Sequence, residues 1–375
     1  MRPPRFALAL LFAPLALCGC GPKAEEEPAW IGLVAAFDGA PGAHLRQGVD
    51  LAVADAADVR VEGRRLAVVT ADDRGSDEAA EAEAVRLLSV NRVAALIGGP
   101  DAAPSLRLAR AAQPYGAPVV LPCEIAGPLP GDAVFTLGVR PGWRGQVLAR
   151  HAAGQLKAKR AVIITDEREP IAMELANAFA AEWPRDVGTV AEWDTYRSDA
   201  ELPDRVDHAA GGKPDVMLIA ASASDFLKAR TRLGSAASHP VLLYGGPDVA
   251  AAALTAEGGD AITATVYTPD GLTDRGKEFA GKYRDRFHAA PDLPAVQGYD
   301  ATRAMFDAMT RAKSVAADKV RDRLAATADF DGLTGPITFK DGRARRRVFV
   351  VALHGGETKL VQTIDPEPDA PAGSR

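Results

Sequence analysis

The amino-acid sequence predicts an α/β protein with two doubly wound lobes and a C-terminal region of antiparallel hairpins. Its 375 residues exceed the roughly 100–200 residues of a typical single domain, which favours two domains. From Trp30 onward, short apolar runs alternate with helical segments, as expected for parallel strands covered by helices on both faces. The 35 glycines and 27 prolines fit many short elements joined by tight turns.

Composition and charge exclude several classes of protein. The chain is 47% hydrophobic and 25% charged, as is usual for globular proteins, and differs from a coiled coil, a collagen-like chain or a multi-span membrane protein. The formal net charge of −6 argues against a nucleic-acid partner, because such proteins carry a basic surface.

The N-terminal segment is expected to be an export signal. Arg2 and Arg5 precede the apolar stretch 6–17, which is shorter than the ~20 residues that span a bilayer. A positive start, a short apolar stretch and small residues near its end are typical of a secretory signal peptide. We therefore assign residues 1–19 to a signal peptide.

The end of that segment, Leu17-Cys18-Gly19-Cys20, resembles the lipobox of bacterial lipoproteins, in which the cysteine after the cleavage point carries lipid. On this resemblance Cys20 is lipidated and 20–28 form a tether. The protein would then lie in the periplasm or on the extracytoplasmic face, anchored to the membrane. A plain signal peptide with two incidental cysteines is the alternative. Only Cys123 lies in the folded part, so we expect no intrachain disulfide there.

Two groups of expected strands follow in order along the chain. The first group covers 31–37, 66–70, 94–97, 119–121 and 134–137, with helices over 42–57, 77–90, 102–115 and 143–156. The second group covers 161–165, 187–193, 216–220, 241–244 and 262–267. Ligands of such sheets bind beyond the carboxyl ends of the strands, which directs attention to the loops after 37, 97, 121, 165, 220 and 244.

Other patterns define the remaining elements. Ser198 and Glu201 have the spacing of a capping box for the helix that ends before Gly211. Phe279, Tyr283 and Phe287 form a stripe at helical spacing, which indicates core packing rather than a partner surface. After residue 335, short alternating strands at 337–339, 348–353 and 360–364 are separated by Asp341-Gly342 and Gly355-Gly356, and indicate antiparallel hairpins. The Pro-rich tail 365–375 is expected to be disordered.

Several segments together resemble the leucine/isoleucine/valine-type periplasmic binding proteins, the solute-binding subunits of branched-chain amino-acid ABC importers. The segments are Ile31-Gly-Leu-Val34, Gly48-Val-Asp-Leu-Ala52, Val68-Val-Thr-Ala-Asp-Asp73, Val93-Ala-Ala-Leu-Ile-Gly98, Tyr115-Gly-Ala-Pro-Val-Val-Leu-Pro122, Tyr299-Asp-Ala-Thr302 and Phe330-Asp-Gly-Leu-Thr-Gly-Pro-Ile337. The resemblance covers about 29–364. It implies the type I periplasmic-binding-protein fold, in which two lobes enclose a ligand and are joined by three crossovers.

When the lobe boundaries of the family are transferred to this sequence, 29–139 and 268–333 belong to lobe one, and 140–267 and 334–364 belong to lobe two. Hinges are then expected near 139–141, 267–269 and 333–336, which contain Pro141, Pro269 and Gly335-Pro336. The family implies a small-molecule ligand, an ABC permease and an ATPase as partners. Closure around the ligand lets the transporter distinguish loaded from empty protein.

An enzyme is not expected. The six histidines lack metal-ligand spacing, and neither a phosphate-binding loop nor a nucleophile elbow occurs, so we assign no catalytic residue, metal or cofactor. Cys123 is interpreted as buried packing. Asp72-Asp73 is interpreted as a strand-end turn rather than a cation site, and the arginines of 343–347 as a solvated hairpin edge.

The ligand pocket of the amino-acid-binding members is not retained. Their first-lobe hydroxyl pair falls here on Asp101 and Ala102, and their Ser-Ala-Thr run on Cys123-Glu124-Ile125. The aromatic residues that stack on ligand in the family fall near Glu169 and Ser222, and the acidic anchor for the amino group near Asp248.

We add Phe37 and His44 as candidate ligand-binding residues, His44 being alternatively an exposed first-turn histidine. Acids in place of hydroxyls favour a neutral or cationic ligand over a branched-chain amino acid. Alternatively both acids turn outward and the cleft is vestigial.

A second functional class also stays open: a non-transport lipoprotein that uses this scaffold for protein contacts, like the penicillin-binding-protein activators. Permease and ATPase genes beside this one would favour the importer.

Overall fold

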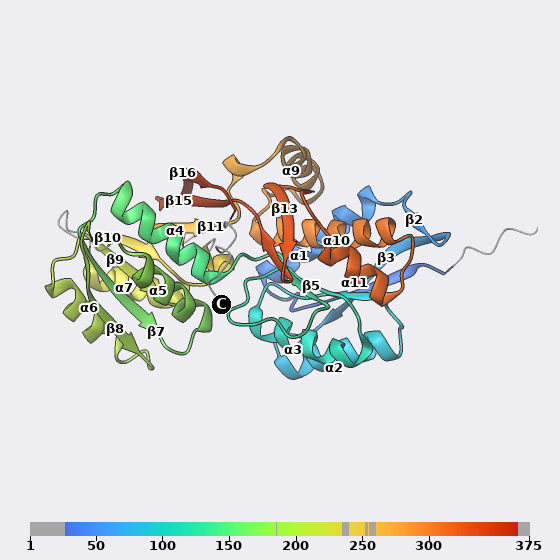
Figure 1. Ribbon diagram of the computed structural model, residues 1–375, viewed down its shortest axis with the longest axis horizontal. Coiled ribbons are helices and arrows are strands. Elements are labelled where there is room, and N and C mark those ends of the chain that lie inside the picture. The colour runs from blue at the N-terminus through green and yellow to red at the C-terminus, as the bar shows by residue number, and fades with distance from the viewer. Residues whose placement is uncertain (1–26, 185, 235–239, 252–253, 255–259, 367–375) are drawn as a thin grey trace, which may run out of the picture.

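Two lobes lie side by side along the long axis of the molecule (Figure 1). The computed structural model describes residues 27–184, 186–234, 240–251, 254 and 260–366. Each lobe has one central sheet with an apolar layer on either side, so both are doubly wound. In the first sheet Ile97 faces one layer and Leu96 the other; in the second, Ile163 and Ile164 do the same. The predicted fold class is confirmed.

The first lobe is built on a nine-stranded sheet of order β12-β13-β14-β6-β5-β4-β1-β3-β2. The strands β1, β3, β4, β5 and β6 run parallel, in agreement with their continuous apolar sequences. The strands are β1 (Ala29–Ala35), β2 (Arg60–Val61), β3 (Arg64–Asp72), β4 (Ala95–Ile97), β5 (Val119–Leu121), β6 (Val134–Thr136), β12 (Phe330–Gly332), β13 (Gly335–Lys340) and β14 (Arg343–Arg345).

Helices from both ends of the sequence cover this sheet. They are α1 (Ala40–Asp55), α2 (Asp77–Ser89), α3 (Ala102–Ala112), α9 (Asp274–Phe287), α10 (Leu293–Ala312) and α11 (Ala317–Ala325), with short 3-10 turns η1 (Gln113–Tyr115) and η3 (Pro269–Gly271). Two glycines allow α1 and α10 to touch closely. A Cβ on Gly48 would lie 2.0 Å from the Ala295 carbonyl oxygen, and one on Gly298 would lie 2.2 Å from that of Leu45.

The second lobe is built on a seven-stranded sheet of order β16-β15-β11-β10-β9-β7-β8, in which β7 to β11 are parallel and β15 and β16 antiparallel. Its strands are β7 (Arg160–Asp166), β8 (Thr189–Tyr196), β9 (Val216–Ala220), β10 (Val241–Tyr244), β11 (Ala261–Thr265), β15 (Val348–His354) and β16 (Glu357–Ile364). Its described helices are α4 (Pro141–Gly154), α5 (Pro170–Glu182), α6 (Leu202–Gly211), α7 (Ala223–Leu233) and the 3-10 turn η2 (Asp248–Ala250).

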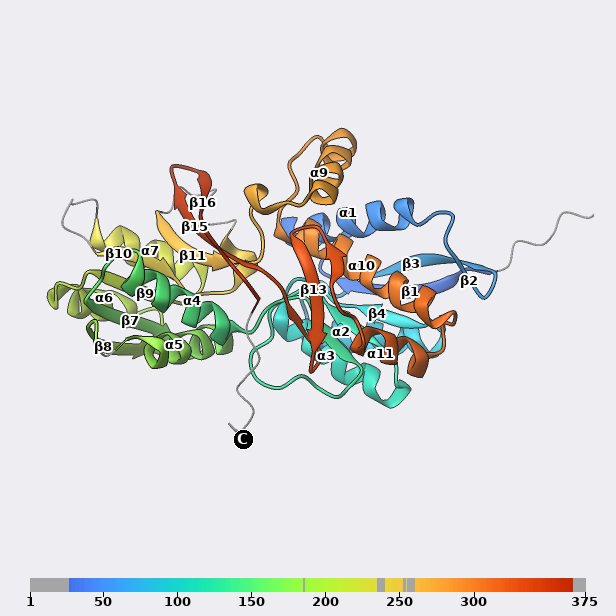
Figure 2. The same cartoon turned by 45° about the horizontal axis from the view of Figure 1, so that its top comes forward.

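The third crossover differs from the expected position. We assigned 334–364 to lobe two, but β13 and β14 pair with each other and β14 pairs with β6 of the first sheet. The chain therefore changes lobes after Arg345. In Figures 1 and 2 the ribbon runs from the lobe that contains β13 to the lobe that contains β15. The predicted position of the crossover was wrong because two hairpins with similar sequence patterns follow one another, and only the second of them, β15–β16, joins the second sheet.

The sequence suggested that the arginines of 343–347 form a solvated hairpin edge; Arg347 is exposed, but the prediction is wrong for Arg346 and Arg343. Arg346 is 1% exposed and donates to the Thr334 hydroxyl at 2.7 Å. Its guanidinium also lies 3.5 Å from the buried carboxylate of Asp300 on α10. Arg343 donates to the carbonyl oxygens of Ile125 and Gly127. These arginines thus hold the crossover to the first lobe.

The structure confirms the predicted hairpin turns and aromatic core stripe but not the predicted helix cap. The hairpin turns at Asp341-Gly342 and Gly355-Gly356 are confirmed, and all four residues have positive φ. Phe279 and Tyr283 are buried, as the core-packing interpretation requires. The capping box is wrong: α6 begins at Leu202 with Glu201 as its N-cap, and Ser198 instead donates to the Glu201 carboxylate at 2.7 Å.

The interpretation of Asp72-Asp73 as a turn is confirmed, because their carboxylates accept from the backbone amides of Arg74 and Gly75 at 2.9 Å. Cys20 and most of the expected tail lie outside the described residues. Within the described ranges, none of the helices combines the length and apolar character needed to cross a bilayer.

Candidate ligand-binding site

A cavity of about 480 Å³ lies between the two lobes. Loops at the carboxyl ends of β4 and β5 and the start of α10 form its first-lobe wall, and loops after β7 and β10 form its second-lobe wall. Such strand ends meet at one edge of a parallel sheet, which explains why segments distant in sequence converge here. The lining residues are Pro100–Pro104, Leu106, Cys123, Glu124, Ala126, Arg168–Ile171, Pro247–Val249, Leu293 and Gln297.

Helix N-termini carry acids into the cavity. Asp101 is the N-cap of α3 and Glu169 the N-cap of α5; both are extended, and neither side chain caps its own helix. The positive end of a helix dipole stabilises a nearby anion, and here the protein supplies that anion itself. Burial raises the pKa of Asp101, and burial together with Asp166 raises that of Glu169.

A buried ion pair crosses between the lobes beside the cavity. Glu124, in the loop after β5, accepts from Arg144 of α4 at 2.7 Å. Arg144 is fully buried and also donates to the carbonyl oxygens of Gly246 at 3.0 Å and Ala264 at 2.5 Å. Those carbonyls belong to the second lobe, so Arg144 is fixed there and holds the first-lobe carboxylate against it.

Asp248 joins this pair from the turn after β10. Its backbone amide donates to Glu124 Oε2 at 2.9 Å, and its Oδ2 accepts from the Val266 amide at 3.0 Å. Glu124 Oε1 and Asp248 Oδ1 are buried and, among the described residues, lack any hydrogen-bond partner. Burial raises the pKa of Glu124, although Arg144 opposes the shift. Two buried carboxylate oxygens beside the cavity thus lack a donor among the described residues.

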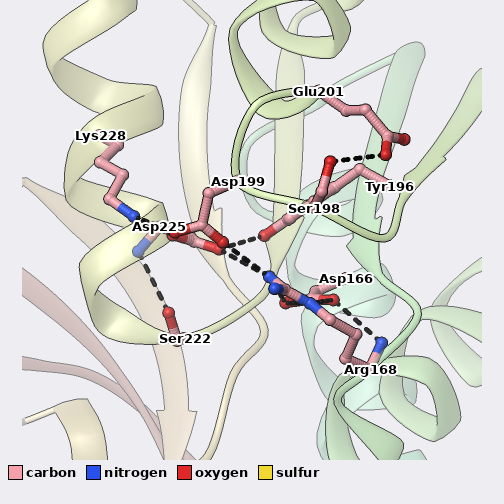
Figure 3. Close-up of polar contacts among 9 residues, drawn as sticks. All are labelled: Asp166, Arg168, Tyr196, Ser198, Asp199, Glu201, Ser222, Asp225 and Lys228. Carbon is pink, nitrogen blue, oxygen red and sulfur yellow. Dashed lines mark hydrogen bonds and ion pairs between the residues drawn. The ribbon is translucent and has the colours of Figure 1, made fainter.

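Arg168 is the cation of the cavity wall, and its charge is already compensated. Its guanidinium forms a forked contact with Asp166 at 2.8–3.2 Å and contacts Asp199 at 3.0 Å (Figure 3). Asp225 and Lys228 extend the network; Lys228 donates to Asp225 at 2.7 Å. The cavity therefore has four lining carboxylates and one arginine whose partners are other acids.

Six of the ten predicted site residues line this cavity: Asp101, Ala102, Cys123, Glu124, Glu169 and Asp248. The other four do not. Ile125 is fully buried in the apolar layer beneath the loop, and Phe37 packs partly against the opposite layer. Ser222 caps α7 by accepting from the Asp225 amide at 3.2 Å. His44 contacts Asp292, the N-cap of α10, at 2.6 Å.

The sequence did not identify Arg144, Arg168 or Gln297. Arg144 and Gln297 lie inside helices, where a polar residue normally indicates a solvent-facing position, and only the fold shows that both are buried. Arg168 follows β7 directly, at a strand end where a search for charged residues would have found it.

The chemistry of the remaining candidates is limited. Cys123 is buried, and burial raises the pKa of its thiol to about 12, so the reactive thiolate is disfavoured. Glu192 and Asp194 of the outer strand β8 and His208 of α6 lie close enough to share a cation, but none of the three lines the cavity. There His208 Nδ1 contacts the two carboxylates directly at 2.9 and 3.0 Å.

Known structures share this architecture. A leucine-binding protein from Thermotoga maritima is 26% identical with a TM-score of 0.79, covering 90% of this chain and 99% of that one. A branched-chain amino acid transporter substrate-binding protein from Streptococcus pneumoniae, in complex with isoleucine, is 19% identical with a TM-score of 0.77, covering 91% and 100%. An ABC transporter solute-binding protein from R. palustris, in complex with benzoate, is 21% identical with a TM-score of 0.76, covering 92% and 99%.

The family model described as periplasmic binding protein matches residues 30–357, which include every residue that lines the cavity and nearly all of both sheets except β16. Members of this family are substrate-binding proteins rather than enzymes, and the family implies an extracytoplasmic location. The chain belongs to the periplasmic binding protein family, and its fold is that of the type I branched-chain amino-acid binding proteins.

Proposed function

We propose that this protein is an extracytoplasmic solute-binding lipoprotein that captures a small ligand between its lobes and delivers it to an ABC permease and ATPase. The single observation that carries the proposal is the cavity between the lobes, whose wall takes residues from both. A ligand that contacts both walls stabilises the closed arrangement by its greater affinity for it. That change of shape is the signal a transporter needs.

The ligand is proposed to be neutral or cationic rather than a branched-chain amino acid. The structural neighbours with leucine, isoleucine or benzoate bind carboxylates, whereas Asp101 and Glu124 line the first-lobe wall here. A ligand carboxylate about 4 Å from ionised Asp101 meets on the order of 4 kcal/mol of repulsion at an effective dielectric constant near 20, whereas Arg144 compensates the charge of Glu124. That is nearly a thousandfold in affinity at roughly 1.4 kcal/mol per tenfold.

The proposed anchoring rests on the N-terminal sequence. Cys20 follows a stretch that resembles a lipobox, and residues 20–28 would tether the folded part, which begins with β1 at Ala29, to the membrane. The anchor keeps a solute-binding protein near its transporter.

Mass spectrometry of small molecules retained by the purified protein, followed by calorimetry with leucine, isoleucine and valine, tests the ligand class. We expect a retained neutral or cationic molecule and no micromolar binding of the three amino acids. Micromolar leucine binding would show that our mapping of the pocket is wrong. Protein in which neither retained nor added solutes bind would instead favour the alternative, a scaffold for protein contacts.

A further inference from the structure

We propose that Glu192, Asp194 and His208 form a binding site for a divalent d-block metal ion, with Zn²⁺ as the best fit, at the β8 edge of the second lobe. Glu192 and Asp194 lie on β8, the last strand of the second sheet, and His208 lies on α6. None of the three lines the cavity between the lobes, so the inference is independent of the proposed function.

The first argument is the convergence of the three ligand atoms. His208 Nδ1 lies 2.9 Å from Glu192 Oε1 and 3.0 Å from Asp194 Oδ2, and one ligand atom from each residue lies within 4.8 Å of the others. Ligand atoms that are each about 2.1 Å from a tetrahedral zinc ion are about 3.4 Å apart. Changes of about half an ångström in the two nitrogen–oxygen distances would therefore let all three atoms hold one ion.

The second argument is that a proton serves this arrangement only in part. The contact of His208 Nδ1 with Asp194 is a hydrogen bond, whereas its contact with Glu192 lacks hydrogen-bond geometry. An imidazole nitrogen carries at most one N–H group, which points at one acceptor. Among the described residues, His208 is the only hydrogen-bond or ion-pair partner of either carboxylate. A metal ion on the Nδ1 lone pair would contact both carboxylates at once.

The charges also fit a dication. The side chains of Glu192 and Asp194 are only 25% and 14% exposed, so both carboxylates are partly removed from water. With a neutral imidazole they leave two negative charges, which one divalent ion balances. Arg205 of α6 is the other charged group that faces His208, but its guanidinium lies 3.9 Å from Glu201. The two acids of β8 thus keep their charge for an ion.

A β-bulge turns the two acids toward α6. The pairing of β8 with β7 skips Ala191. Val190, before the bulge, packs against one apolar layer, and Tyr196, after it, lies in the other layer together with residues of α6. Glu192 and Asp194 precede Tyr196 at strand spacing and therefore share its side of the sheet. A bulge that re-aims side chains in this way is common beside functional sites.

The ligand set selects the kind of metal. An imidazole nitrogen suits zinc, copper and nickel, whereas Ca²⁺ and Mg²⁺ prefer oxygen ligands throughout. The His208 side chain is 64% exposed, which gives an ion in solution access to the three ligands and leaves its fourth position to water. The bound ion would fasten the edge strand β8 to α6.

Calorimetry with Zn²⁺ on the purified, untagged protein, after a chelator has removed bound metal, tests the site, with Ca²⁺ and Mg²⁺ as comparisons. We expect micromolar binding of Zn²⁺ alone. His208→Gln, Glu192→Gln and Asp194→Asn should each weaken it at least roughly 10-fold, the lower limit for losing even an outer partner of a metal ligand. His354→Gln is the matched control, because His354 contacts Asp260 at 2.8 Å and no second carboxylate among the described residues, and it should bind like wild type.

Two further measurements separate metal binding from a structural ion pair. Saturating Zn²⁺ should raise the melting temperature of wild type and of His354→Gln, but not that of His208→Gln. Nitrogen NMR should show Zn²⁺ shifting the Nδ1 signal of His208. If one variant fails to fold, the other two test the same ion. Wild type that binds no Zn²⁺, variants with unchanged Zn²⁺ affinity, or equally tight binding of Ca²⁺ would each overturn the site while leaving the proposed function standing.

Discussion

At the scale of single residues, the buried charges sit where the chain passes between lobes. Asp300 of α10 accepts from the Leu333 amide at 3.1 Å and faces Arg346 at 3.5 Å, so it connects the β12–β13 turn of the first lobe to the third crossover. Thr334, in the same β12–β13 turn, donates to the Val266 carbonyl at 3.2 Å, which connects that turn to the second crossover. Asp300 is 1% exposed, and burial raises its pKa to about 6 despite Arg346.

This raised pKa predicts a specific dependence of stability on pH. Folded protein holds the Asp300 proton up to about pH 6, whereas unfolded protein releases it near its ordinary value of 3.8. Asp300 therefore makes the free energy of unfolding fall as the pH rises between these two values, by on the order of 2–3 kcal/mol, and makes no further change above them. Urea unfolding of wild type and Asp300→Asn across this range measures the difference.

A control of opposite sign exists in the second lobe. Hydrogen bonding to Arg232 lowers the pKa of the exposed Asp207, so its contribution is present above the unfolded value and is lost as the pH falls. The wild-type minus Asp207→Asn difference should therefore be flat from pH 4 to pH 6 and should decrease only as the pH falls below about 3.8. A wild-type minus Asp300→Asn difference that is flat from pH 4 to pH 6 would contradict the assignment.

The sequence could locate the site residues only in part, and the reason is physical. Loops that follow parallel strands must meet at one sheet edge, so Asp101, Glu124, Glu169 and Asp248 could be found from strand positions. The partner of Glu124 could not, because nothing local in an arginine within a helix reveals that the helix buries it.

At the scale of elements, the contact between α1 and α10 depends on two small residues. Gly48 and Gly298 face the opposite backbone at distances that leave no room for a methyl group. The helices can therefore approach until side chains such as Leu45 and Val49 are fully buried. A side chain added at either glycine would collide with backbone atoms, which cannot move aside as a flexible side chain can, so the packing of the two helices would be lost.

Gly298→Ala should destabilise the protein by roughly 1–3 kcal/mol, because the new methyl group would lie 2.2 Å from the Leu45 carbonyl oxygen and force the helices apart. Gly281→Ala on α9 is the matched control. A Cβ there meets no atom within 4 Å, so alanine should stabilise by about 0.5–1 kcal/mol through its better helix propensity. Equal effects of both substitutions in denaturant unfolding would refute the close contact.

Element positions were more predictable than element partners. The bounds of β5, β9 and β10 agree with the predicted strands, because an apolar run between turn residues fixes the segment locally. The sheet that β13 and β14 join depends on contacts with β6, about two hundred residues earlier in the chain. No local pattern contains that information, which is why the third crossover was misplaced.

At the scale of the whole molecule, the lobes are joined by three short segments. These lie between β6 and α4, between β11 and η3, and between β14 and β15. Each lobe has its own pair of apolar layers, so most of each core stays covered when the lobe moves as a unit, although Leu293 of α10 packs into a layer of the second lobe. We propose that the three segments are hinges, and that Glu124–Arg144, close to the first of them, keeps the lobes in register during the motion.

Hinge closure predicts a change in overall size. A compact chain of this length has a radius of gyration of about 21 Å, and an open two-lobed protein exceeds that value. Small-angle scattering of the refolded protein should therefore give a larger radius, which falls toward about 21 Å when the solute retained during purification is added back.

Hydrogen exchange provides the second measurement. Because the lobes move as rigid units, amides of the central strands should stay protected in both states, and protection should change only at the crossovers and the cavity wall. Identical scattering curves at saturating solute would refute closure, and loss of protection within either sheet would refute rigid lobes.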